Sequence, residues 1–98
     1  YVYFYEGNAV ETGADSFASK AYVTVFNYSG KIVVPRTEVA AVADAAGLAA
    51  AGLTTTGYAE GESLKVRDGK LYLGVACRDG SSSNRRANIL VYDCVQAE

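Results

Sequence analysis

Short runs in which apolar and polar side chains alternate recur along most of this chain, and alternation is the period that β-strands produce. The runs are rich in β-branched and aromatic residues, which strands favour. They stand at residues 1–5, 21–26, 31–34, 63–66, 71–75 and 89–92. The pattern therefore predicts about five to six strands.

Turn residues join two pairs of these runs into hairpins. The segment Asn27-Tyr28-Ser29-Gly30 separates one pair, and Asp68-Gly69 separates the other. Asp-Gly between alternating runs is typical of a type I′ turn, which needs positive φ at both central residues. With this turn, Val66 pairs with Leu71. Pro35, the only proline, is expected to end the second arm of the first hairpin because proline cannot donate to a ladder.

One segment has the period of a helix. Apolar residues recur at a spacing of three to four from Val39 to Leu53, and Thr37 is suited to cap the first turn. The helix is expected to end at Gly47 or at Gly52. Because its apolar stripe is mostly alanine, it should pack closely on a sheet.

The order of these elements predicts an α+β fold. Strand, hairpin, helix, hairpin and strand follow one another, which gives an antiparallel or mixed sheet with one helix packed on one face. The 98 residues are enough for one small domain that covers residues 1–98.

The two cysteines, Cys77 and Cys94, have two interpretations. They are buried thiols, or they form a disulfide worth about 3 kcal/mol in the chain-entropy model. A simple hairpin of the last two strands would hold them about 20 Å apart, beyond the reach of a disulfide. A bridge therefore requires a last strand that does not pair with its predecessor, and we expect this arrangement.

Composition excludes several function classes. The chain has no histidine, methionine or tryptophan, and its net charge is -2. Histidine is the commonest general base and metal ligand, so we expect no enzyme, metal site or cofactor. Nucleic acid is not an expected partner because phosphate binding needs surplus Lys and Arg. No apolar run is long enough to cross a bilayer.

Three arginines, Arg78, Arg85 and Arg86, flank a polar Gly/Ser-rich stretch that reads as a surface loop. Their guanidinium groups are suited to clamp a carboxylate, a phosphate or an acidic patch of a partner. The alternative is a solvated loop whose charge only maintains solubility.

Alternation also places Tyr1, Tyr3 and Tyr5 on one face of the first strand. Tyrosine is enriched at interfaces, so this stripe is a second candidate binding site. The alternative is that the stripe covers the second face of the sheet. If it is exposed on an edge strand, we expect a homo-oligomer.

Asn27-Tyr28-Ser29 fits the N-glycosylation pattern and lies in a predicted turn. With two cysteines and a start at Tyr1 rather than Met, this favours a secreted, processed product. The chain shares only size and class with small secreted effectors and toxins. We expect a secreted, non-enzymatic interaction protein of that type, which binds a protein or cell-surface partner. The alternatives are a carbohydrate-binding or enzyme-inhibitor module, or a structural domain excised from a larger surface protein.

Overall fold

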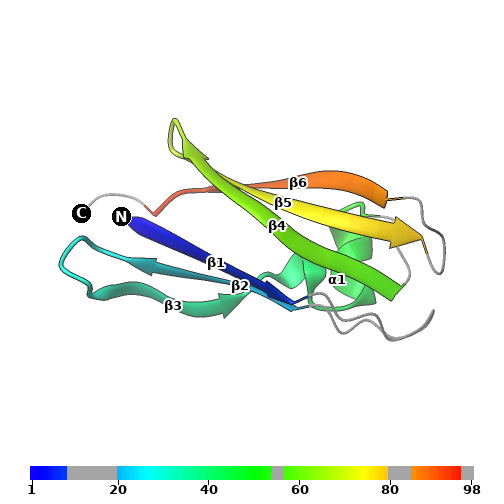
Figure 1. The fold of residues 1–98 in the computed structure, drawn as a ribbon, viewed down its shortest axis with the longest axis horizontal. Helices are drawn as coiled ribbons and strands as arrows, with labels where there is room; N and C mark the ends of the chain where they lie inside the picture. The colour runs from blue at the N-terminus through cyan, green and yellow to red at the C-terminus, as the bar shows by residue number, and fades with distance from the viewer. Residues whose placement is uncertain (9–19, 54–56, 80–84, 96–98) are drawn as a thin grey trace.

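The computed structural model describes residues 1–8, 20–53, 57–79 and 85–95, and these form two three-stranded antiparallel sheets (Figure 1). The N-terminal sheet contains β1 (Val2–Asn8), β2 (Lys20–Phe26) and β3 (Ile32–Glu38), and the C-terminal sheet contains β4 (Gly57–Arg67), β5 (Lys70–Asp79) and β6 (Arg85–Asp93). A 3-10 turn, η1 (Ala40–Val42), and a short helix, α1 (Ala45–Ala50), connect them.

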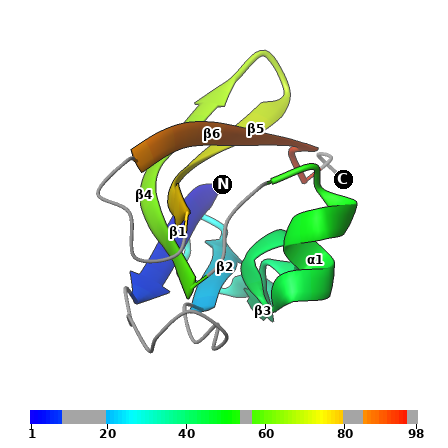
Figure 2. The same cartoon turned by 90° about the vertical axis from the view of Figure 1, so that its right-hand side faces the viewer.

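The expected number of strands is therefore confirmed, but the expected single sheet is wrong. The fold is mostly β, because α1 has only six residues and is too short to cover a whole sheet face. A sheet with one apolar face needs a second layer, and here the other sheet supplies most of it. The N-terminal sheet and α1 together cover the inner face of the C-terminal sheet (Figure 2).

The hydrophobic core lies between the two sheets. Alternate residues of β5 face inward, and Leu73, Val75 and Cys77 are its most deeply buried side chains. Ala21 on β2 and Leu48 on α1 are buried in the same core. The period-2 pattern of β5 thus decides which face is covered.

The sheets approach each other most closely along β1 and β4. A side chain on Gly7 would bring its Cβ within 3.2 Å of the Cα of Gly61. Two glycines at this point let the strand backbones come close, which closes this side of the sandwich.

Both predicted hairpins are present. Asp68 and Gly69 have φ values of 49° and 76°, as a type I′ turn requires. The predicted pairing of Val66 with Leu71 is also observed.

Pro35 does not end the first hairpin as expected. β3 continues through it to Glu38, because β3 is an edge strand whose outer N–H groups need no partner within the sheet. Between the pairs Val23–Thr37 and Val25–Val34, β3 spans one residue more than β2. This bulge accommodates the proline.

The predicted start of the helix is also wrong. Thr37 belongs to β3, where it pairs with Val23, and its hydroxyl donates to the Pro35 carbonyl at 2.6 Å. Asp44 is the actual N-cap, and its Oδ1 accepts from the Gly47 N–H at 2.7 Å. α1 ends at Ala50, and Gly52, one of the two expected stops, follows the C-cap Ala51 with a φ of 75°.

The last strand contradicts the expected disulfide. β6 pairs antiparallel with β5 in a simple terminal hairpin, with Cys77 opposite Arg86, and no disulfide joins Cys77 to Cys94. The Cys94 N–H donates to Gly69, which is eight residues from Cys77, or about 26 Å at the rise of a strand. The sequential pairing of β4, β5 and β6 therefore keeps the sulfurs far apart.

Candidate interaction surfaces

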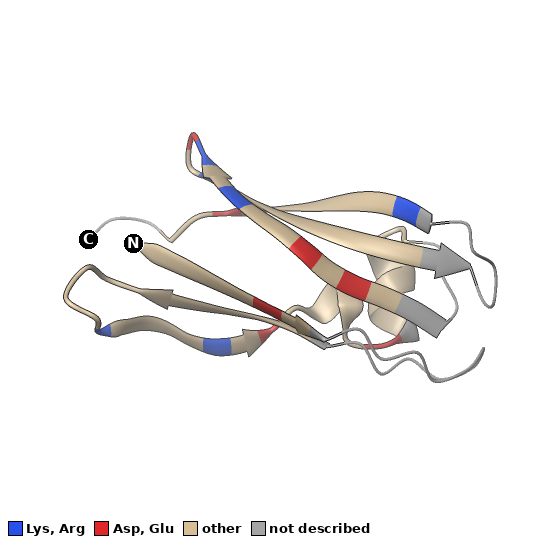
Figure 3. Cartoon of the chain, in the orientation of Figure 1, with Lys and Arg blue, Asp and Glu red and all other residues tan. Residues whose placement is uncertain are grey.

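The three candidate arginines belong to strands rather than to a loop. Arg78 pairs with Arg85 at the end of the β5–β6 hairpin where the chain passes from β5 to β6, and Arg86 follows opposite Cys77. The backbone therefore brings all three to one end of the C-terminal sheet. Arg86 is exposed, whereas the side chains of the other two and residues 80–84 lie outside the described structure. In Figure 3, charges of both signs are spread along both sheets.

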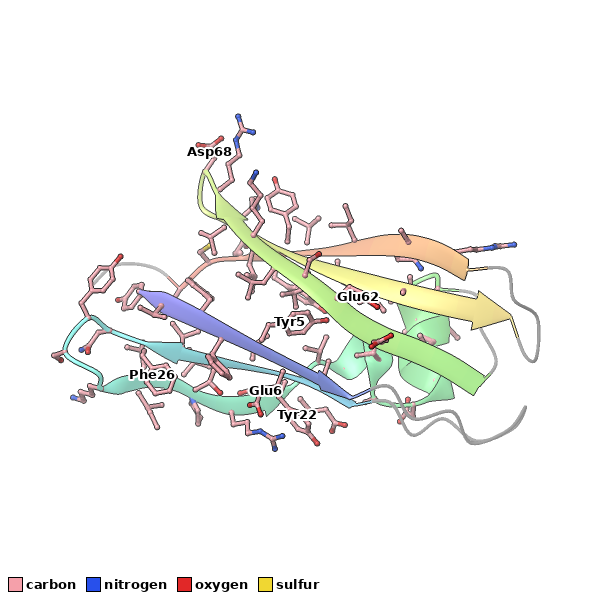
Figure 4. All side chains as sticks on the ribbon, viewed as in Figure 1. Tyr5, Glu6, Tyr22, Phe26, Glu62 and Asp68 are labelled. Atoms are coloured by element: carbon pink, nitrogen blue, oxygen red, sulfur yellow. The ribbon has the colours of Figure 1, made fainter. Side chains whose placement is uncertain are left out.

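The tyrosine stripe faces the core instead of solvent. Tyr5 is half-buried between the sheets and points from β1 toward the C-terminal sheet (Figure 4). Its hydroxyl lies 3.5 Å from the Gly74 carbonyl, and the Tyr3 hydroxyl accepts from the Val95 N–H at 2.8 Å. Burial raises the pKa of Tyr5 to about 12, and repulsion from Tyr92 and Glu62 adds to this shift. Of the three predicted residues, only Tyr1 is exposed.

The outward face of the N-terminal sheet is apolar at one end. Val2, Phe26 and Ile32 form a row across β1, β2 and β3, and Phe4 lies two residues further along β1. We call these four residues the Phe4 patch. Phe4 is 56% exposed, Ile32 54% and Val2 44%.

Sequence reasoning missed this patch although the alternation was correct. Alternation places Val2 and Phe4 on one face of β1 and the tyrosines on the other, and the sequence leaves open which of the two faces is covered. The structure covers the tyrosine face, where the hydroxyls of Tyr3 and Tyr5 have backbone partners. The patch becomes visible only from the register that brings Val2, Phe26 and Ile32 side by side. That register depends on how three strands pair.

A polar cluster lies beside the Phe4 patch on the same face. The Arg36 Nε donates to Glu6 Oε1 at 3.0 Å, and the guanidinium stacks 3.5 Å from the centroid of the Tyr22 ring. The hydrogen bond to Glu6 raises the pKa of Arg36. Figure 4 shows Glu6 and Tyr22 next to each other on the side of the N-terminal sheet that faces away from β4. An apolar area with a charged border is the usual composition of a protein interface.

The outer face of the C-terminal sheet carries a groove of about 620 Å³. Its lining combines the Tyr72 ring with the basic Lys65 and Arg67, the hydroxyl of Ser63 and the apolar side chain of Ile89. The groove is open to solvent and is wide enough for a small polar ligand.

Asn27 holds the turn between β2 and β3. Its Oδ1 accepts from the Ser29 N–H at 3.0 Å, from the Ser29 hydroxyl at 2.7 Å and from the Lys31 N–H at 3.0 Å. Tyr28 and Ser29 are exposed, so the glycosylation pattern lies in a surface turn. The turn gives Asn27 a structural role that does not depend on a glycan.

Within the described ranges, no group of three or more potential metal-ligating residues comes together, and no helix has the length and apolar character of a membrane span. Comparison of the chain with protein-family models, curated proteins and solved structures found no match. The surfaces themselves therefore carry the functional argument.

Proposed function

We propose that this chain is a non-enzymatic interaction protein that binds an apolar surface of a protein partner through the Phe4 patch. The observation that carries the proposal is the outward position of Val2, Phe4 and Ile32, each more than two-fifths exposed. Contiguous apolar residues on a small soluble protein mark interaction sites, and aromatic residues at the centre of such patches dominate binding energies.

The shape of the patch favours a protein over a small molecule. Its residues lie on three neighbouring strands of one sheet face rather than around a cavity. The Arg36–Glu6 pair beside it supplies charged groups that orient a partner. Secretion, and action as an effector or toxin, remain part of this proposal, and the exposed turn at Asn27 is compatible with both.

The test is a binding screen on an array of extracellular protein domains. The wild-type chain is compared with the double variant Phe4→Ser/Ile32→Thr and with Val66→Thr, which removes exposed apolar area from the C-terminal sheet. We expect the double variant to bind its partner at least about tenfold more weakly, the loss typical of central interface residues, and Val66→Thr to bind normally. Equal binding by all three proteins would refute the patch. Loss only after replacement of Arg78, Arg85 and Arg86 by alanine would assign binding to the arginine end instead.

A second candidate function rests on the groove around Tyr72. An aromatic ring beside basic and hydroxyl groups is suited to stack on a sugar and hydrogen-bond its hydroxyls. A glycan array probed with wild-type protein and with Tyr72→Ala tests this function. A glycan signal that Tyr72→Ala abolishes and Phe4→Ser leaves unchanged would favour the carbohydrate-binding alternative.

A further inference from the structure

β6 is the edge strand with the least protection among the described strands. It pairs with β5 over nine consecutive positions without a register shift, and it contains no proline. By contrast, β3 carries Pro35 and two register shifts, and β1 lies against β4. A long, regular edge presents a row of N–H and C=O groups that another strand can join.

One backbone hydrogen bond fixes which groups of β6 face this edge. The Cys94 N–H donates to the Gly69 carbonyl at 2.9 Å, so Cys94 is bonded toward β5. In an antiparallel ladder the bonded residues alternate. Residues 85, 87, 89, 91 and 93 therefore direct their N–H and C=O groups away from β5.

The outward-directed residues of β6 can pair with the same residues of β6 in a second copy of the chain. When two β6 strands run antiparallel with Ile89 opposite Ile89 of the second copy, every outward-directed residue meets another outward-directed residue. Ala87 then stands opposite Val91, and Arg85 opposite Asp93. Arg85 of one copy is thus placed opposite Asp93 of the other at both ends of the contact, where it adds a second cation to the Lys70–Asp93 ion pair.

Other registers that keep the hydrogen bonds in phase are poorer. Centring the pair on Ala87 places Arg85 opposite Ile89, and centring it on Val91 places Ile89 opposite Asp93. Each of these gives up both charge pairs and shortens the shared ladder. Charge complementarity therefore selects both the partner and the register.

The side chains agree with this pairing. Ile89 is 66% exposed and Val91 53% exposed, and both lie on the outer face of the C-terminal sheet. In the paired arrangement they form one apolar strip with the same residues of the second copy, and cross-strand pairs of β-branched residues stabilise sheets.

From these observations we infer that the chain forms a two-fold symmetric dimer through β6, in which the two C-terminal sheets join into one six-stranded sheet. The Phe4 patch lies on the other sheet and is left exposed, so the dimer presents two copies of it. The inference does not depend on the proposed partner.

Charge-reversal variants test both the contact and its register by analytical ultracentrifugation. We expect the wild type to sediment at twice the 10.3 kDa mass of the chain. Arg85→Asp and Asp93→Arg each place like charges at both ends and should sediment as monomers. A mixture of the two variants places opposite charges at both ends and should restore a dimer. A monomeric wild type, or a mixture no heavier than its components, would overturn the inference.

Hydrogen exchange provides a measurement that does not depend on the folding of a variant. The outward amides of Ala87, Ile89 and Val91 should exchange at least about tenfold more slowly at high protein concentration than after dilution. Leu90, whose amide is bonded to β5, is the internal control and should change less. Equal exchange of the outward amides at both concentrations would also overturn the inference.

Discussion

At the scale of single residues, Tyr5 shows how the sandwich holds a polar side chain between its sheets. Its ring packs on Gly61, where an added Cβ would lie 2.7 Å from the Tyr5 hydroxyl oxygen. Burial then disfavours the phenolate, which explains the raised pKa. Tyr5, which the sequence suggested as a binding residue, thus packs between the two sheets.

We predict that Tyr5→Phe reduces the alkaline sensitivity of the fold. The pKa of Tyr5 is about 12 in the folded protein against an ordinary value of 10.0, so the folded state holds the proton more tightly. This stabilisation is complete below pH 10 and is lost as the pH rises toward 12. Because Tyr5 is only half-buried, its share is about 1 kcal/mol. Urea unfolding at pH 9 and pH 11.5 measures it, and an unchanged difference in Tyr5→Phe would contradict the assignment.

Gly47 leads to a second prediction at this scale. In most helices Gly→Ala is stabilising, because glycine disfavours a helix by about 1 kcal/mol. Here an added Cβ would lie 2.0 Å from the Ala40 carbonyl oxygen. Gly47→Ala should therefore destabilise the protein, by about 1–3 kcal/mol, as overpacking does. The exposed Ala46→Gly serves as control and should lose only the ordinary helix propensity. Thermal unfolding that ranks Gly47→Ala above the wild type would refute the close contact.

At the scale of elements, local sequence patterns predicted most of the features that depend only on residues close together in the chain. Asp68-Gly69 defines its hairpin because two adjacent residues fix both positive φ values. The predicted helix start at Thr37 is wrong because Thr37 pairs with Val23 of β2, and no local rule reveals this pairing. Pro35 was misread for the same reason, since its tolerance depends on β3 being an edge. Pairing between distant segments is the information that local patterns lack.

The β4–β5 hairpin gives a prediction for an element. Gly69 has a φ of 76°, which residues with a Cβ adopt at a penalty of about 1–2 kcal/mol. Gly69→Ala should lose that amount in urea unfolding. Asp68→Asn is the matched variant, because asparagine tolerates positive φ, and its stability should stay within about 0.5 kcal/mol of the wild type. Equal losses in the two variants would exclude a type I′ turn.

At the scale of the whole molecule, shape explains why so much apolar surface is exposed. The radius of gyration is 14.1 Å, and a compact domain of this length has about 12.6 Å. The molecule measures 44 × 22 × 20 Å and has one core layer between thin sheets. Each sheet therefore has one face that no other element of the described structure covers. The sequence could predict alternation within strands, but which alternate set faces the core depends on how the sheets stack.

The cysteines provide a test of this architecture as a whole. Cys77 is fully buried between the sheets, whereas Cys94 lies half-buried beyond the end of β6. We expect an alkylating reagent to label Cys94 in the folded protein and to reach Cys77 only when the sandwich opens. Labelling of Cys77 should then follow the free energy of global unfolding and accelerate in urea.

Intact-mass measurements over time distinguish the outcomes, with Cys94→Ser as the variant that reports on Cys77 alone. Rapid labelling of Cys77 in that variant would place it outside the core. A wild-type mass lower by two hydrogens, with neither thiol labelled before reduction, would mean that Cys77 and Cys94 are joined. Because that bridge cannot coexist with the β5–β6 register, it would also rule out the terminal hairpin from which the β6 dimer is inferred.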